Sequence, residues 1–303
     1  MNLPDSIVDF LADKLKTNIR QLEGRFAFID QIEKYNNICD SAGKHNAFTL
    51  NGREKQYQQF LFYRYFFDVH KPLIVTEGKT DVRYIKAALR SLYADYPDLV
   101  EKDAKGKFLY KVDFFKRSKR FKYLFNLALD GADSLTDLYD YFASKGKDKR
   151  TNYLAYFLRI TQRTPQNPVI FVYDNEIANK NKPLCKFSNH ANLNEAQKQS
   201  LGKNLFLRLT PCGNLFLLTN PLVEERTESE IEHMFTQETR SIELSGKKLS
   251  LDSNFDNTRC FGKDHFSNYV LANYSTIDFS GFRPLLNALR TILQEYVKDE
   301  TEE

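Results

Sequence analysis

Closely spaced pairs of cysteine or histidine are missing from this sequence of 303 residues. The five histidines form no H-x-H or H-x-x-x-H pair, and the four cysteines lie far apart, at Cys39, Cys185, Cys212 and Cys260. This spacing argues against a disulfide framework, a zinc finger and a histidine-based zinc site. We expect reduced thiols, as in a cytoplasmic protein.

Long hydrophobic runs are missing as well. No apolar stretch approaches the roughly 18 residues that a membrane-spanning helix needs. The first ten residues contain Asp5 and Asp9 and no basic region, so we expect no secretory signal peptide. With 42% hydrophobic and 28% charged residues, the sequence predicts a soluble protein with a core and no membrane partner.

Basic residues gather in one stretch, although the net charge of +4 is modest. Between Lys102 and Lys122, lysines and arginines are interleaved with aromatic residues. Such a mixture suits a nucleic-acid surface, because the charges pair with phosphates and the rings stack on bases. A solvated strand and loop with its aromatic residues in the core fits the same pattern equally well. The candidate nucleic-acid contacts are Lys111, Lys116, Arg117, Lys119, Arg120 and Lys122.

Apolar residues recur at helical spacing through residues 1–70, and strands alternate with helices from residue 71 onward. Residues 179–199 are polar and are expected to be irregular. We expect strands at 73–75, 107–115, 168–173, 205–209 and 215–218, and helices at 82–92, 135–143, 228–235, 265–273 and 284–297. This alternation predicts an α/β fold with a mainly parallel sheet flanked by helices, preceded by an N-terminal helical segment. The predicted division is into residues 1–70 and 71–303.

Two of the predicted strands end in carboxylates. Glu77 follows the strand at 73–75, and Asp174 and Glu176 follow the strand at 168–173. Ligand sites of α/β folds lie at the carboxyl ends of strands, so these side chains are expected to meet. Convergent carboxylates without histidine suit Mg²⁺ acting on phosphates. Asp81, in the first turn of the next helix, is a candidate ligand for a second ion.

Each of these residues also has a structural interpretation. Gly78 suits a simple turn, and Asp81 suits the start of a helix, where it complements the helix dipole. Asp174 suits a turn after an ordinary strand. Each motif alone is more typical of a structural role, whereas the two together favour a functional site. Lys79 lies in the turn after Glu77, where it is the better placed of two basic residues to contact a phosphate.

The two motifs resemble those of the Toprim domain, an α/β module of topoisomerases, bacterial-type primases and the OLD family of nucleases. Glu77 matches the glutamate of the first motif, and Asp174 with Glu176 matches the acidic pair of the second. The family usually has Asp-x-Asp, so Glu176 departs from it by one methylene. The form E-G-K-T-D with Asp81 resembles the OLD-like branch in particular.

Further segments are similar to that branch. Gly131 with Ser134 stands in the place of its glycine-rich loop, and Gly262-Lys263 with Phe266 resembles its late lysine segment. The resemblance implies that Lys263 stabilises charge on the phosphate. An acidic residue near Glu232 joins the metal site in such relatives, although a solvated helix face is the favoured interpretation of Glu232 here.

The segment Leu22–Gln31 and the aromatic helix Tyr57–Val69 resemble the joint of retron reverse transcriptases fused to a Toprim domain. No Y-x-D-D polymerase motif is present, so the chain resembles the C-terminal half of such a fusion. The resemblance implies a toxic effector of anti-phage defence. Its implied partners are the reverse transcriptase and its branched RNA–DNA.

We therefore expect a nuclease that depends on Mg²⁺ or Mn²⁺ and cleaves DNA or RNA. Glu77, Asp81, Asp174 and Glu176 are the expected metal ligands, and Glu77, Lys79 and Lys263 the expected catalytic residues. The alternative is a non-catalytic module that docks nucleic acid or the reverse transcriptase. The sequence leaves open DNA or RNA as the substrate, one or two metal ions, and a homo-oligomer.

Overall fold

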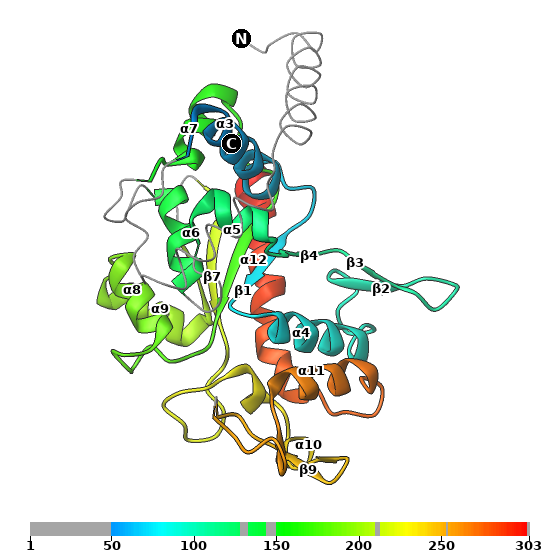
Figure 1. The fold of residues 1–303 in the computed structure, drawn as a ribbon. Helices are drawn as coiled ribbons and strands as arrows, with labels where there is room; N and C mark the ends of the chain where they lie inside the picture. The colour runs from blue at the N-terminus through cyan, green and yellow to red at the C-terminus, as the bar shows by residue number, and fades with distance from the viewer. Residues whose placement is uncertain (1–49, 128–132, 144–149, 210–212, 253, 302–303) are drawn as a thin grey trace.

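A five-stranded sheet in the order β4-β1-β5-β7-β6 lies at the centre of the molecule (Figure 1). The computed structural model describes residues 50–127, 133–143, 150–209, 213–252 and 254–301. The strands are β1 (Leu73–Thr76), β4 (Asp113–Phe114), β5 (Val169–Tyr173), β6 (Phe206–Arg208) and β7 (Leu215–Thr219). Only the edge strand β6 runs antiparallel to its neighbour in this sheet. The predicted α/β fold with a mainly parallel sheet is confirmed.

The central strands are buried on both faces, which explains why they are continuous apolar runs in the sequence. Every residue of β5 and β7 is buried. Side chains alternate along β5, so Phe171 packs into one hydrophobic cluster while Ile170 and Val172 pack into another. The sheet thus separates two cores.

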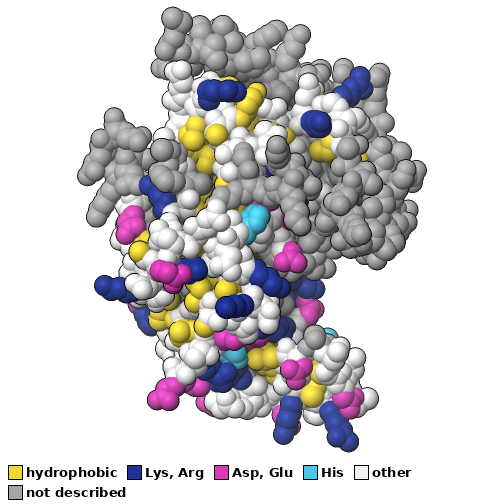
Figure 2. All heavy atoms as spheres, turned by 90° about the vertical axis from the view of Figure 1, so that its left-hand side faces the viewer, with side chains coloured by type: hydrophobic (Ala, Val, Ile, Leu, Met, Phe, Trp, Pro, Cys, Tyr) yellow, Lys and Arg dark blue, Asp and Glu magenta, His cyan; other side chains and the backbone are white. Residues whose placement is uncertain are grey.

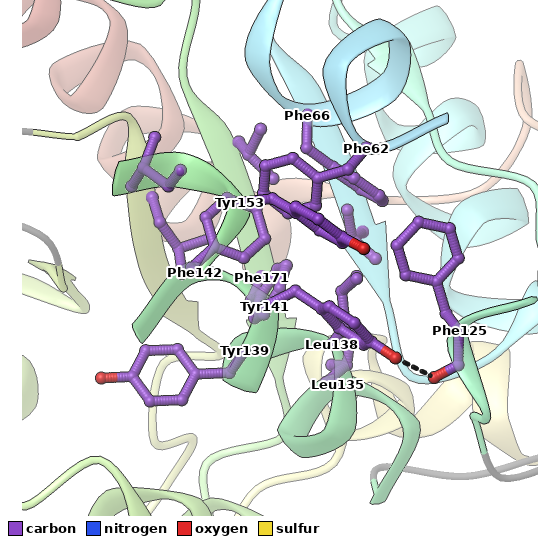
Figure 3. Close-up of a cluster of buried hydrophobic side chains, with 14 of the residues drawn as sticks. Phe62, Phe66, Phe125, Leu135, Leu138, Tyr139, Tyr141, Phe142, Tyr153 and Phe171 are labelled. Atoms are coloured by element: carbon purple, nitrogen blue, oxygen red, sulfur yellow. Dashed lines mark hydrogen bonds between the residues drawn. The ribbon is translucent and has the colours of Figure 1, made fainter. Parts of the chain in front are cut away.

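The core that contains Phe171, part of which is drawn in Figure 3, includes side chains of five described helices that lie between β4 and β6 in the chain. They are α5 (Lys119–Phe125), α6 (Asp133–Ala143), α7 (Tyr153–Thr161), α8 (Pro183–His190) and α9 (Glu195–Asn204). The opposite core contains side chains of α4 (Lys79–Ser91), α11 (Lys263–Ala272) and α12 (Arg283–Thr301). Helices α4 and α11 lie side by side (Figure 1).

The helical segment near the N-terminus is confirmed for the residues that the structure describes. Helix α3 (Gly52–Phe62) begins with a capping box of Asn51 and Glu54 and continues into the π-helix η1 (Tyr63–Phe67). Phe62 is fully buried, and its ring centroid lies 4.9 Å from that of Phe142 on α6 (Figure 3). These helices therefore pack into the same core as the sheet. The predicted helices before residue 50 lie outside the described residues.

The prediction of a single strand at 107–115 is wrong. Strand β3 (Phe108–Tyr110) pairs with β2 (Val100–Lys102) in a hairpin that projects from the body, whereas β4 joins the central sheet (Figure 1). The backbone changes partner between them, because the Lys111 N–H donates to Leu99 and the Asp113 N–H donates to Pro72.

The expected irregular segment at 179–199 is also wrong, because it contains α8 and the start of α9. Pro183 stands in the first turn of α8, and Asn194 forms a capping box with Gln197 at α9. Leu184 and Phe187 are fully buried, so a short apolar face is enough to dock a polar helix. Charged side chains of both signs are interspersed on the face of the molecule shown in Figure 2.

The remaining elements follow β7. They are η2 (Ile231–Met234), α10 (Gln237–Arg240), the small sheet of β8 (Glu243–Leu244), β9 (Lys247–Leu249) and β10 (Cys260–Phe261), and η3 (Ser280–Phe282). Within the described ranges, no helix combines the length and the apolar character needed to cross a membrane.

Candidate active site

Glu77 and Asp174 lie at the same edge of the sheet. They follow the neighbouring parallel strands β1 and β5, in which Thr76 stands opposite Val172. Glu77 Oε1 accepts a hydrogen bond from the Asp174 N–H at 3.3 Å, across 97 residues of sequence. The structure therefore brings together the two carboxylates that the strand ends predict to meet.

Asp81 stands in the first turn of α4, as the sequence predicts. Its Oδ2 accepts from the Gly78 N–H at 2.9 Å, and the Thr80 hydroxyl donates to its Oδ1 at 3.1 Å. Asp81 therefore caps its helix, which is the structural role that the sequence left open. It also lies close enough to Glu77 for its charge to raise the pKa of that carboxyl.

Asp174 connects the sheet edge to a segment distant in sequence. Its Oδ1 accepts hydrogen bonds from Asn220 Nδ2 at 2.6 Å and from the Ile231 N–H at 2.9 Å. Backbone hydrogen bonds between Asn175 and Ser229 hold the two segments together. These contacts bring η2, with its acidic residues, against the site.

Glu176 is buried, and its Oε1 accepts from Lys182 Nζ at 2.6 Å. This lysine is absent from the sequence-predicted site. The only sequence signal for it is its position six residues after Glu176, in a segment that was expected to be irregular.

Glu232 is fully buried, so the solvated helix face favoured from the sequence is wrong. Its Oε2 accepts from Lys263 Nζ at 3.2 Å, and the same ammonium donates to Glu230 Oε2 at 3.0 Å. Its Oε1 has no hydrogen-bond partner of normal distance and angle among the described residues, but the Tyr84 hydroxyl lies close enough to the Glu232 carboxylate for that carboxylate to raise the pKa of the tyrosine, after the larger effect of burial. The neighbouring Tyr84 hydroxyl donates to the Lys263 carbonyl at 3.3 Å.

Four carboxyl groups of the site have raised pKa values. Burial and the charge of Asp81 raise the pKa of Glu77 to about 8. Burial, with the charges of Glu77 and Asp81, raises the pKa of Asp174 well above its usual value. Burial also raises the pKa values of Asp81 and Glu232. Neighbouring carboxylates repel each other when they are ionised, so a nearby cation would favour their charged forms.

The described part of the chain contains no group of three or more His, Cys, Asp or Glu side chains arranged to hold a metal ion. The carboxylates instead have backbone N–H groups and two lysines as partners. The donor set nevertheless fits Mg²⁺ or Mn²⁺, which prefer carboxylate oxygens. The residue types therefore suit the ion in chemistry and charge, with Glu77, Asp174 and Glu232 as the candidates to hold it, but the described residues do not arrange three of them around one position.

Basic residues line the starts of α4 and α11. Lys79 Nζ lies 2.6 Å from Asp264 Oδ1, and Arg83 donates to the same oxygen at 2.8 Å. The Lys79 side chain is 72% exposed, so it is accessible to a large substrate. Lys263 is half-buried beside Glu232. Burial lowers the pKa of Lys263, but Glu232 and Glu230 raise it more, so the ammonium stays charged.

Arg117 lies at the site rather than on an outer surface. Its guanidinium donates to the Glu77 carbonyl at 2.8 Å and to the Thr76 carbonyl at 2.6 Å. Lys111 pairs with Glu101 on the projecting hairpin, and Arg120 donates to the Tyr57 hydroxyl. The nucleic-acid role of these residues and of Lys116, Lys119 and Lys122 stays a prediction. Ser134 is buried at the start of α6, and Gly131 lies outside the described residues.

No family model matches this chain, and no solved structure matches it. The geometry of the site and the sequence motifs are therefore the basis for a function.

Proposed function

We propose that this protein is a metal-dependent phosphodiesterase of the Toprim type that cleaves DNA or RNA. The observation that carries the proposal is the meeting of Glu77 and Asp174 at the carboxyl ends of adjacent parallel strands. Glu232 and Lys263 reach the same place from distant segments. Oxygen ligands with a basic residue beside them are the parts that phosphodiester hydrolysis needs.

A Mg²⁺ or Mn²⁺ ion, when bound, would supply positive charge beside the phosphoryl oxygens. Asp174 and Glu232 would hold the ion, and Glu77 would either hold it with them or accept the proton of the attacking water. Lys263 and Lys79 neutralise charge that develops on the phosphate. Lys182 pairs with Glu176 and compensates its charge.

The sequence resemblance adds a biological setting to this proposal. The chain acts as the effector of a retron-type anti-phage system, with a reverse transcriptase and its branched RNA–DNA as partners. Exposed basic residues on and before α5 then contact the nucleic-acid backbone, because lysines pair with phosphates. A toxic nuclease of this kind acts in the cytoplasm.

A second candidate is a docking module that binds nucleic acid without cutting it. The observation in its favour is that the carboxylates have lysine and backbone partners, with no three-ligand metal cluster in the described ranges. The two functions separate in one measurement, because only the nuclease degrades nucleic acid when a divalent ion is added.

The test is incubation of the purified protein with labelled single- and double-stranded DNA and RNA, in Mg²⁺, Mn²⁺ or EDTA. We expect cleavage with either ion and none in EDTA. Glu77→Gln and Asp174→Asn are expected to lower the rate about 100-fold or more, since each removes a charge that acts on the reacting groups. Glu195→Gln, on the exposed face of α9, is the matched control. Full activity of Glu77→Gln would show that the assignment is wrong.

A further inference from the structure

Three neighbouring parallel strands, β1, β5 and β7, end at the edge of the sheet where Glu77 and Asp174 lie. Asn220 is the first residue after β7, in which Thr219 stands opposite Tyr173 of β5. It is 1% exposed, and its backbone N–H donates to the Tyr173 carbonyl at 3.3 Å. The end of the third strand therefore places a buried amide beside Asp174, at a residue to which the sequence motifs assign no role.

The Asn220 amide holds one oxygen of the Asp174 carboxylate. Its Nδ2 donates to Asp174 Oδ1 at 2.6 Å, and the Ile231 N–H donates to the same oxygen at 2.9 Å. None of the described residues donates to Asp174 Oδ2, and Asp174 is partly exposed. One oxygen of the carboxylate is thus fixed by two N–H groups, whereas the other makes no hydrogen bond to the described residues.

The backbone of Asn220 is itself held by a buried neighbour. Asn175 Nδ2 donates to the Asn220 carbonyl at 2.8 Å, and Asn175 exchanges two backbone hydrogen bonds with Ser229. Both Asn175 and Ser229 are buried. Buried hydrogen-bonded networks are rigid, so the direction of the Asn220 amide is set by the fold before any ligand binds.

A second buried asparagine, Asn214, immediately precedes β7 and makes different contacts. Its Nδ2 donates to the backbone carbonyls of Phe66 and Asn167, at 3.0 and 2.8 Å. The Oδ1 atoms of Asn214 and Asn220 both lack a partner among the described residues. The two amides are therefore alike in burial and in their unpaired oxygen. They differ in what their N–H groups hold, which is backbone in one case and a carboxylate in the other.

We infer that Asn220 is a positioning residue, which holds Asp174 Oδ1 and so leaves Oδ2 as the oxygen that acts in the reaction. The inference rests on the proposed function and adds a residue to it. Hydrogen-bond partners that orient a functional carboxylate typically contribute roughly tenfold to 100-fold to activity. Because Asn220 acts only through Asp174, its loss should slow the reaction without weakening the binding of nucleic acid.

The test compares the full chain carrying Asn220→Ala or Asn220→Asp with Asn214→Ala and Asn214→Asp, at the other end of β7. Alanine removes the amide without adding bulk, and aspartate keeps its shape but has no N–H donor. Cleavage of a labelled DNA or RNA oligonucleotide is measured with Mg²⁺. We expect the Asn220 variants to lower kcat roughly tenfold to 100-fold, with KM close to that of the wild type. The Asn214 variants should lose thermal stability and keep their kcat.

A second measurement does not depend on activity. Thermal unfolding in EDTA of Asn220→Ala, Asp174→Ala and the double variant tests the contact itself. The hydrogen bond between the two residues can be lost only once, so the two changes in melting temperature should not add. Asn214→Ala with Asp174→Ala is the control pair. Its changes should add, because the length of β7 separates the two residues.

The outcomes separate the inference from the proposed function. A lower kcat with unchanged KM in the Asn220 variants, together with non-additive unfolding, supports the inference. Wild-type kcat in folded Asn220→Ala, a raised KM alone, an equal loss of kcat in Asn214→Ala or additive unfolding overturns it and leaves the nuclease proposal standing. No cleavage by the wild type overturns both. If neither Asn220 variant folds, the amide serves the fold and the inference is wrong.

Discussion

At the residue scale, Arg117 shows how a side chain acquires its role from tertiary structure. The sequence places it in a basic and aromatic stretch, which predicts contact with phosphates. In the folded protein it donates to two carbonyl groups at the end of β1, about 40 residues earlier in the chain. No local pattern distinguishes it from its neighbour Lys119. Its position indicates that it orients Glu77 through the backbone.

Replacement of Arg117 by methionine is expected to leave the Thr76 and Glu77 carbonyls without this donor. An unsatisfied buried acceptor costs about 1–3 kcal/mol, so the free energy of unfolding should fall by that amount in urea titrations. The cleavage rate should fall with it, whereas affinity for nucleic acid and its salt dependence should stay close to wild type. Lys119→Met, in the same stretch, is the comparison, because Lys119 is exposed and is predicted to contact a phosphate. A weaker affinity with a shallower salt dependence in Arg117→Met would instead assign Arg117 to a phosphate.

Glu77 gives a prediction for stability as a function of pH. Its pKa rises from an ordinary 4.5 to about 8 on folding, because burial and Asp81 disfavour the charged form. The folded state therefore binds the proton more tightly than the unfolded state, and stability is lost as the pH rises from about 4.5 to 8. Glu77→Gln removes this loss. In EDTA, the variant should gain stability relative to wild type between pH 5 and pH 8.

Urea unfolding at several pH values checks this expectation. Glu195→Gln makes the same chemical change on an exposed surface. Its free energy of unfolding should change with pH in the same way as that of the wild type. If the difference between Glu77→Gln and wild type is constant with pH, the glutamate is ionised in the folded protein without a metal. The charge argument for a cation at this site would then fail.

The candidate site was predictable from sequence only in part. Glu77 and Asp174 follow apolar runs, and the ends of parallel strands meet at one edge, so their proximity needs no further information. Glu232 and Lys182 give no such signal. Their roles depend on where η2 and the segment before α8 pack, and an acidic run in sequence looks the same whether it is buried or solvated. The roles of Glu232 and Lys182 therefore required coordinates.

At the scale of elements, the strands buried on both faces were the easiest to predict. Every residue of β5 and β7 is buried, so each strand is a continuous, mostly apolar run between polar segments. Helices α8 and α9 were missed, because they dock through a few side chains and are otherwise polar. The residues of β3 and β4 were predicted as one strand, because both halves have the same composition. Only their different hydrogen-bond partners separate them.

The contact between η2 and η3 gives a test at this scale. A Cβ added at Gly281 would lie 2.1 Å from the Met234 carbonyl oxygen, which is far inside van der Waals contact. Gly281→Ala must therefore move η2 or η3, and we expect a loss of about 1–3 kcal/mol of stability, as for an overpacked core. Because η2 carries Glu232, Mn²⁺ affinity should fall as well.

Gly202 provides the matched control, since it lies in α9 and an added Cβ would meet nothing within 4 Å. Gly202→Ala is expected to raise stability by about 0.5–1 kcal/mol, because alanine favours the helix. Thermal unfolding and Mn²⁺ titration of the two variants measure both effects. Unchanged Mn²⁺ affinity in a destabilised Gly281→Ala would show that the position of η2 does not affect metal binding.

At the scale of the whole molecule, the two hydrophobic cores indicate whether the chain can be cut into parts that fold separately. The sequence predicts a boundary near residue 70, where a helical segment gives way to the sheet. Phe62, Phe66 and Phe67 of α3 and η1 are almost fully buried in the core that also contains Phe171 of β5 (Figure 3). Separation at residue 70 would therefore cut through one core rather than between two.

Two truncated chains test this point. A fragment of residues 71–303 loses the buried aromatic side chains of α3 and η1, and removal of each one costs about 3–5 kcal/mol. Three such losses are comparable with the total stability of an ordinary domain, about 5–15 kcal/mol. We therefore expect this fragment to lack a cooperative thermal transition, whereas residues 50–303, which keep both cores, should unfold cooperatively. A cooperative transition in the shorter fragment would make the helical segment a separate unit, as the sequence predicts.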